Sequence, residues 1–205
     1  AGKTTTLKLL VGLLQPQKGE ARVAGHDLAR ASRAARRATA YVPDKPFLYE
    51  RLTAWEYLEL VAGLWELADE AAWRRRAQAE LERFGLIGNG EDLLESYSLG
   101  MRQKMLIIAG LIHEPAVWIL DEPMSGLDPR SCRMMRDLLQ AEAKRGAAVL
   151  LSTHTLDTAE RLCHRVGIID HGRLVTEGTL AELQKLAGRE SGRLEELFLE
   201  LTAAG

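Results

Sequence analysis

Apolar residues recur along this chain with two periods, one typical of strands and one typical of helices. Short apolar runs bounded by turn or breaker residues predict strands at residues 20–24, 39–42, 117–120 and 147–152. Residues 166–170 and 173–176 flank His171 and Gly172, which predicts a hairpin. Strands that alternate with helical stretches favour an α/β fold with a mostly parallel sheet.

Helical spacing of apolar residues occupies most of the remaining chain. Leu7, Leu10, Val11 and Leu14 predict a helix close to the start. The further helical stretches are residues 53–84, 101–113, 130–145, 157–163, 180–186 and 194–201. The first of these six is rich in charge and ends at a Gly-containing break, so we interpret it as a helical insertion between two parts of an α/β core.

Composition narrows the class of protein only slightly. With 205 residues, 46% of them hydrophobic and 27% charged, the chain fits a soluble globular domain with room for a subdomain. A formal charge of −2 gives no reason to expect a nucleic-acid partner. Two cysteines, Cys132 and Cys163, lack metal-type spacing, and we expect reduced, buried thiols.

No apolar run reaches the roughly 20 residues that a membrane-spanning helix needs. The longest, residues 105–112, fits a buried helix. If the protein serves a membrane process, we expect another polypeptide or a segment outside this sequence to span the lipid.

Two adjacent carboxylates, Asp121 and Glu122, follow the strand at 117–120. Open α/β sheets place their ligands at the carboxyl ends of such strands. Neighbouring carboxylates repel each other unless a cation or a proton separates their roles. The pair therefore predicts a Mg²⁺ site beside a general base.

The first residues match the end of the phosphate loop G-x-x-x-x-G-K-[ST], the Walker A motif. In that motif backbone N–H groups wrap the phosphates, so Gly2, Lys3, Thr4 and Thr5 are candidate nucleotide-binding residues, with the Thr4 hydroxyl on Mg²⁺. The alternative is an ordinary helix start capped by Thr4. The chain begins inside the motif, and we expect it, as given, to bind nucleotide poorly or not at all.

Five motifs together resemble the nucleotide-binding domain of ABC transporters. They are the phosphate-loop remnant at residues 1–4, Tyr41-Val-Pro-Asp44, Ser96-Tyr-Ser-Leu-Gly-Met-Arg-Gln103, Asp121-Glu122 and Ser152-Thr-His154. The resemblance implies a P-loop NTPase (RecA-like) core at 1–48 and 103–205, with a helical ABC signature subdomain at 49–102. Three segments, at residues 43–49, 97–103 and 194–198, are most similar to the exporter-type group with separate ATPase and permease chains.

The resemblance also implies roles for individual residues. Asp121 would hold the Mg²⁺ water shell, and Glu122 would polarise the attacking water as general base. His154 would contact the γ-phosphate of ATP and align the attacking water with Glu122. Ser98 and Gly100 would present donors to the γ-phosphate bound by the other subunit of a dimer. Asp128 lies in the loop that passes along that dimer interface. A plain helix N-cap is the competing interpretation of Ser98.

Two positions depart from the family pattern. Asp44 replaces the usual Gln, and it could still reach Mg²⁺ through water although it adds negative charge near phosphates. Leu99 replaces a glycine and would alter how closely the backbone approaches ATP.

The implied function is an ATP-binding, ATP-hydrolysing subunit, working as a homodimer or heterodimer on the cytoplasmic face of the cell membrane with an integral membrane permease. Phe47, Leu48 and Tyr49 are candidates for the permease contact or, equally, for subdomain core. A soluble ABC-superfamily ATPase of translation or DNA repair and a non-catalytic module with a decayed ATP site are the alternatives.

Overall fold

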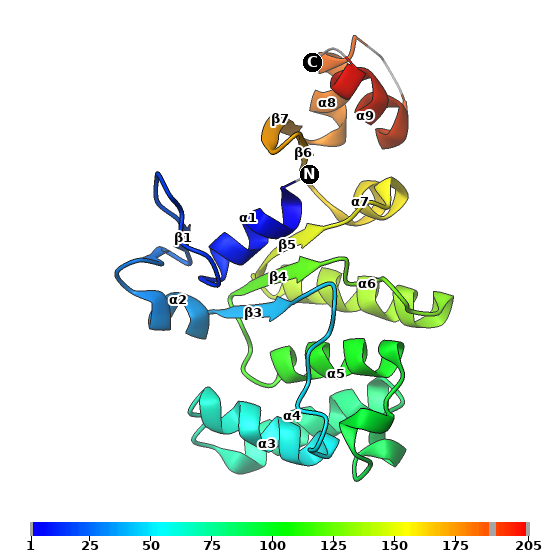
Figure 1. The fold of residues 1–205 in the computed structure, drawn as a ribbon. Coiled ribbons are helices and arrows are strands. Elements are labelled where there is room, and N and C mark those ends of the chain that lie inside the picture. Colours follow the sequence, from blue (N-terminus) through cyan, green and yellow to red (C-terminus); the bar gives the residue numbers. More distant parts are fainter. Residues whose placement is uncertain (1, 189–191, 204–205) are drawn as a thin grey trace.

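A computed structural model describes residues 2–188 and 192–203 as an α/β structure around a small parallel sheet (Figure 1). The sheet has the order β3-β4-β5, with β3 (Thr39–Val42), β4 (Val117–Asp121) and β5 (Ala148–Ser152). Thr39 pairs with Val117, and Val117 pairs with Ala148. All three strands therefore end at the same edge of the sheet, at Val42, Asp121 and Ser152.

The remaining elements, in chain order, are α1 (Lys3–Leu10), β1 (Arg22–Val23), β2 (His26–Asp27), α2 (Ser32–Arg37), α3 (Ala54–Leu64), α4 (Glu70–Arg83), the 3-10 turns η1 (Ile87–Asn89) and η2 (Leu94–Ser96), α5 (Leu99–Leu111), α6 (Pro129–Lys144), α7 (Leu156–Leu162), β6 (Val166–Asp170), β7 (Arg173–Gly178), α8 (Leu180–Leu186) and α9 (Leu194–Ala203).

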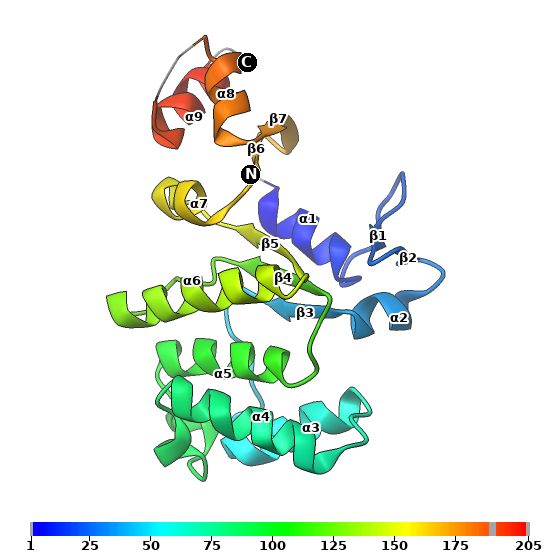
Figure 2. The same ribbon diagram turned by 180° about the vertical axis from the view of Figure 1, so that it is seen from behind.

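Side chains of β4 alternate between two helical layers, which lie on opposite faces of the sheet (Figures 1 and 2). Ile119 packs with Leu7 and Val11 from the first helical segment. Trp118 and Leu120 face the opposite way, into the largest apolar cluster. That cluster also holds residues from α3, α4, α5 and α6, so the helical insertion and the sheet share one continuous core.

Helix α5 approaches the sheet closely because Gly110 has no side chain. A Cβ at Gly110 would lie 2.6 Å from Cη2 of Trp118, well inside contact distance. The indole N–H of Trp118 donates to Glu142 Oε2 of α6 at 3.0 Å, which satisfies its only polar atom. Trp118 therefore fixes the spacing of α5 and α6 against β4.

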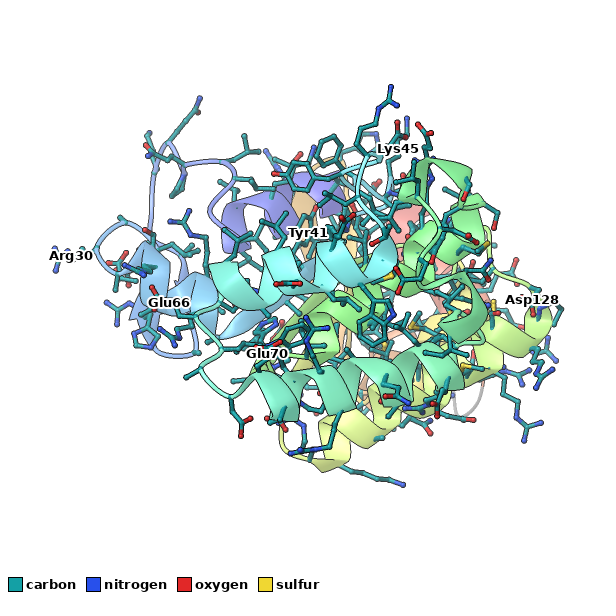
Figure 3. The ribbon with its side chains drawn as sticks, turned by 90° about the horizontal axis from the view of Figure 1, so that it is seen from below. Arg30, Tyr41, Lys45, Glu66, Glu70 and Asp128 are labelled. Carbon is teal, nitrogen blue, oxygen red and sulfur yellow. The ribbon has the colours of Figure 1, made fainter. Side chains whose placement is uncertain are left out.

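The predicted helical stretch 53–84 consists of two helices. Thr53 and Glu56 form a capping box that starts α3, and the Asp69 side chain caps α4. Between them Glu66 has a positive φ of 55°, which ends the first helix. Its carboxylate accepts from Arg33 and, at 3.1 Å, from Arg37, so it joins the insertion to α2 (Figure 3).

Helix α1 is shorter than its apolar spacing predicts. It ends at Leu10, and Gly12 follows with φ +71°. Val11 stays buried, but Leu14 lies beyond the helix with 43% of its surface exposed. The expected helix through Leu14 was wrong because the left-handed turn at Gly12 redirects the chain.

The predicted hairpin forms from β6 and β7, which pair antiparallel. A second antiparallel pair, β1 with β2, replaces the longer single strand expected at 20–24. Among the residues described, β6 makes no ladder with β5, and a cavity of about 1170 Å³ lies between the two strands. Its lining includes Val149, Leu151, Ile168 and Ile169.

No helix within the described residues is long and apolar enough to cross a membrane. Cys132 and Cys163 are free and only partly buried, and burial raises the pKa of both thiols. Their predicted reduced state is compatible with this geometry, whereas the expected full burial was wrong.

Candidate active site

The candidate site forms where β4 and β5 end side by side. Asp121 pairs in register with Ser152, and both residues are buried, with 1% and 6% of their surfaces exposed. Asp121 Oδ2 and Ser152 Oγ make no hydrogen bond with any residue that the structure describes. A buried carboxylate oxygen without a protein donor fits a site for a cation or its bound water.

Glu122 follows directly and has an unusual backbone. Its φ of 49° is rare for a residue with a side chain, and its N–H donates to Ser152 O at 2.9 Å. This turn directs the Glu122 side chain toward the residues that follow β5. Strain of this kind persists where the surrounding structure holds it, and it is common at active sites.

Two side chains after β5 hold the Glu122 carboxylate. His154 Nδ1 lies 2.9 Å from Oε1, and Thr153 Oγ1 donates to Oε2 at 3.2 Å. The tautomer that donates from Nδ1 leaves the second imidazole nitrogen free to accept. The His154 side chain is 76% exposed and that of Glu122 only 17% exposed, so the histidine can meet a ligand while the carboxylate stays oriented.

The start of α1 lies near this edge. Gly2 has φ +107°, and a Cβ there would lie 3.2 Å from the Cα of Gly172. Lys3, Ser152 and Thr153 line the same cavity between β5 and β6. Thr4 and Thr5 are exposed in the first turn of the helix, whose N–H groups can receive an anion. Ala1 lies outside the described residues.

Asp44 follows β3 and is exposed. Burial, and then the negative charges of Asp121 and Asp44, raise the pKa of the neighbouring Tyr41. Both carboxylates therefore act on one phenol. The end of β3 thus contributes a third carboxylate to the neighbourhood of Asp121.

Ser98 caps α5, as one of the two interpretations of the sequence predicted. Its Oγ accepts from the Met101 N–H at 3.3 Å, and the residue is exposed. The first turn of this helix packs on the loop after β4, because a Cβ at Gly100 would lie 3.3 Å from Gly126 O. The structure therefore brings together the motif at residues 96–103, which is the family's signature sequence, and the loop that holds Asp128.

Asp128 has a structural task in this chain. It caps α6, with Oδ1 accepting from the Ser131 N–H at 2.9 Å and Oδ2 from Ser131 Oγ at 2.6 Å. The hydroxyl and then the N–H of Ser131 lower the Asp128 pKa. Figure 3 places Asp128 at the edge of the molecule, where α6 begins.

Thr153 and Tyr41 were missed as site residues by sequence reasoning. The signal for Thr153 was its place between Ser152 and His154, inside a motif already recognised. In residues 2–188 and 192–203 there is no group of three His, Cys, Asp or Glu side chains that could hold a metal ion. A Mg²⁺ ion bound here would need further ligands from phosphates and water, as Mg²⁺ usually has in nucleotide sites.

Comparisons with known proteins agree with this geometry. A family model described as "ABC transporter" matches residues 1–125. The ABC-type transporter ATP-binding protein EcsA of Bacillus subtilis (strain 168) is 38% identical over 202 residues, which cover 98% of this chain and 81% of EcsA. The daunorubicin/doxorubicin resistance ATP-binding protein DrrA of Streptomyces peucetius is 39% identical over 194 residues, 95% of this chain and 58% of DrrA.

A solved structure described as "Structure of ATP binding subunit of ABC transporter" has a TM-score of 0.93 and 38% identity. The match covers 98% of this chain and 83% of that one. The expected P-loop NTPase fold with a helical signature subdomain is thereby confirmed. With its fold and relatives established, the chain belongs to the ABC transporter family, as an ATP-binding domain whose ATP hydrolysis serves transport.

Proposed function

We propose that Glu122 is the general base of the ATPase and that His154 positions it. The observation that carries the proposal is the 2.9 Å contact between His154 Nδ1 and Glu122 Oε1 at the end of the sheet. Glu122 Oε2 is held by Thr153, so the carboxylate has a fixed direction before ATP binds. A fixed base close to the attacking water raises the rate by roughly 10²–10⁴.

The nucleotide would lie across the start of α1 and the ends of β3 and β4. Gly2, Lys3, Thr4 and Thr5 offer backbone donors, a cationic side chain and hydroxyls to the phosphates. The unpartnered Asp121 Oδ2, the Thr4 hydroxyl and, through water, Asp44 are the groups that would hold Mg²⁺. When bound, the ion neutralises charge that develops on the phosphates.

Two copies, or this chain and a similar one, would complete the site between them. Ser98 is exposed at the start of α5, where the helix N-terminus and the Gly100 N–H can receive an anion. In a head-to-tail pair about a two-fold axis, these donors would reach the γ-phosphate held by the other chain. The Ser125–Asp128 loop, packed on α5, would line the same interface.

A separate integral membrane permease would dock beside the helical insertion. Leu48 is buried, with 3% of its surface exposed, whereas Phe47 and Tyr49 are 75% and 54% exposed. Their rings contact each other edge to face, with centroids 6.0 Å apart. Such an exposed aromatic pair is typical of an interaction site. The chain would thus work as a peripheral protein on the cytoplasmic face of the cell membrane.

The Glu122→Gln variant tests the proposed base. We expect the affinity for ATP to stay within about twofold, turnover to fall by roughly 10²-fold or more, and the closed dimer to accumulate with ATP. ATP binding, hydrolysis and dimer mass would be measured on the assembled transporter. Glu20→Gln, an exposed residue next to β1, is the matched control and should hydrolyse ATP normally. Full hydrolysis by Glu122→Gln would exclude Glu122 as the base.

A further inference from the structure

One side chain of α5, Arg102, contacts two separate segments of the chain, at Glu50 and at residues 95–97. Its Nη1 lies 2.6 Å from Glu50 Oε1, its Nε donates to Tyr97 O at 3.0 Å, and its Nη2 donates to Glu95 O at 3.0 Å. Only 22% of the side chain is exposed. Every nitrogen of the guanidinium is therefore bound, which fixes its plane.

Two of these acceptors hold the backbone immediately before Ser98. The Tyr97 carbonyl belongs to the peptide that leads into Ser98, so its hydrogen bond sets where the serine hydroxyl lies. The Tyr97 ring is a second anchor, since it is buried and its hydroxyl donates to Asn89 O at 2.7 Å. Tyr97 is thus held at both its ring and its carbonyl, and this fixes the backbone from which the Ser98 side chain extends.

The third acceptor, Glu50, follows the exposed aromatic pair in sequence. Its backbone oxygen accepts from the Glu95 N–H at 3.0 Å, and the Leu94 N–H donates to Leu52 O at 2.9 Å. Thr53 and Leu93 continue this contact as an antiparallel bridge. A short ribbon therefore joins the chain after Tyr49 to the chain before Ser98, and Arg102 crosses it.

We propose that Arg102 is a positioning residue that couples the Phe47–Tyr49 surface to the placement of Ser98. The inference rests on the proposed function, in which a permease contacts that surface and Ser98 serves the nucleotide of the other chain. A displacement of Tyr49 by a partner moves Glu50, and Glu50 moves the guanidinium that holds the Tyr97 carbonyl. No atom of Arg102 needs to touch ATP for this effect.

The test uses the complete transporter, purified with its own permease in lipid vesicles. Arg102→Lys keeps the charge and can keep the Glu50 contact, but a single ammonium nitrogen cannot reach the acceptors that Nε, Nη1 and Nη2 reach from three positions. We expect permease-stimulated kcat to fall about tenfold or more, because small misplacements of a reacting group have effects of this size. The KM for ATP and the ATP affinity of the isolated subunit should change less than about twofold.

Matched variants separate coupling from folding. Arg74→Lys alters an arginine of α4 that pairs with Glu70 and Glu59 on the surface, and it should keep wild-type stimulation. Glu50→Ala removes the anchor beside Tyr49 and should reduce stimulation, whereas adding Arg102→Lys to it should reduce stimulation little further. The thermal midpoint of each subunit reports its folding.

Two outcomes would overturn the proposal. Stimulation by Arg102→Lys equal to that of Arg74→Lys would exclude coupling, and a loss of ATP affinity that accounts for the whole loss of rate would reduce Arg102 to a structural role. Glu122→Gln in the same vesicles distinguishes the two levels of failure. If that variant is active, the proposed site is wrong. If it is inactive while Arg102→Lys behaves as wild type, only the coupling is wrong.

Discussion

Asp121 is the residue whose surroundings suit a ligand better than they suit the folded chain alone. A buried polar oxygen without a hydrogen-bond donor costs about 1–3 kcal/mol. Glu122, the next residue, adds a left-handed backbone that costs of order 1–3 kcal/mol. The two site carboxylates therefore reduce the stability of the chain in exchange for positions that a bound nucleotide can use.

Replacing Asp121 by Asn should raise the stability of the free chain and weaken the binding of Mg²⁺ with ATP. Because the change replaces a buried carboxyl group by a neutral amide of the same shape, we expect a rise of about 1 kcal/mol in the free energy of unfolding without nucleotide. For a chain of this length that corresponds to a rise in Tm of about 2–4 °C. Calorimetry measures the Tm without ligand and the rise in Tm on adding Mg²⁺ and ATP. We expect that rise to be smaller in the variant than in the wild type.

The exposed Asp137 of α6 provides the control for this substitution. Asp137→Asn should leave Tm within about 1 °C, because surface changes away from special features have small effects. A lower Tm for Asp121→Asn would mean that the folded chain stabilises the carboxylate, and it would remove the argument for a cation site at Oδ2.

Residue roles could be predicted from sequence where the evidence was local. The Ser98 cap involves a donor only three positions away, and the sequence shows both partners. Arg102 gave no such signal, because one acceptor is 52 residues distant and the other two are backbone carbonyls. Apolar spacing likewise could not separate the buried Leu48 from the exposed Phe47 and Tyr49.

At the scale of elements, helix ends are fixed by a few polar side chains. Thr53, Asp69, Ser98, Asp128 and Thr179 each accept from a backbone N–H at the start of a helix. These caps satisfy donors that the first turn leaves open. Because the Asp128 carboxylate caps α6, its protonation links pH to the stability of the start of that helix.

The pH dependence of the α6 cap has a definite sign. The folded-state pKa of Asp128 is lowered by Ser131, so the unfolded chain takes up a proton first as pH falls. The cap thus contributes its full stability above the ordinary aspartate pKa of about 3.9, and this contribution disappears as pH falls through the lower folded value. We expect Asp128→Asn, which caps without titrating, to lose less stability than the wild type between pH 6 and pH 3.

Urea unfolding at several pH values measures this difference. Asp128→Ala removes the cap at every pH and should be less stable than both at pH 6. Parallel pH profiles for the wild type and Asp128→Asn would show that the Ser131 contacts do not hold the charged carboxylate.

The strands and most helices followed from apolar periodicity because their contacts are regular. Strand β4 was predicted at residues 117–120 and extends only one residue further, to Asp121. The long helical pattern at 53–84 hid the break at Glu66, since the residue that takes the positive φ is a glutamate and not a glycine. The end of α1 was missed for a different reason: apolar residues beyond Leu10 kept the spacing although Gly12 had already turned the chain.

At the scale of the whole molecule, the candidate site residues lie in two places. Glu122 and His154 lie at the ends of β4 and β5, whereas Ser98 caps α5, whose first turn packs on the loop at 125–128. The domain bounds 1–48, 49–102 and 103–205 stay a prediction, because one apolar cluster runs through the insertion and the sheet alike. Such a layout suits a site completed by a second chain.

Mixed dimers provide the sharpest test of that layout. Ser98→Asp keeps a good N-cap for α5 but places negative charge where a γ-phosphate would bind. Homodimers of Ser98→Asp and of Glu122→Gln should both be inactive. In a mixed dimer, both defects fall in one composite site and the other site is intact. Random mixing in equal amounts should therefore restore roughly a quarter of wild-type ATPase activity if the sites work independently.

The control for the added charge is Thr179→Asp, at the cap of α8, which should be active alone and give no extra rescue. Mixing must be done by unfolding and refolding or by co-expression, and native mass spectrometry confirms that mixed dimers form. If mixed dimers form without activity, then Ser98 and Glu122 serve the same site within one chain, or both sites must be intact for any turnover. A hydrolysis assay with the Ser98→Asp, Glu122→Gln double variant and wild type separates these cases: a trans arrangement damages both sites of that mixed dimer, whereas a site within one chain leaves the wild-type site intact.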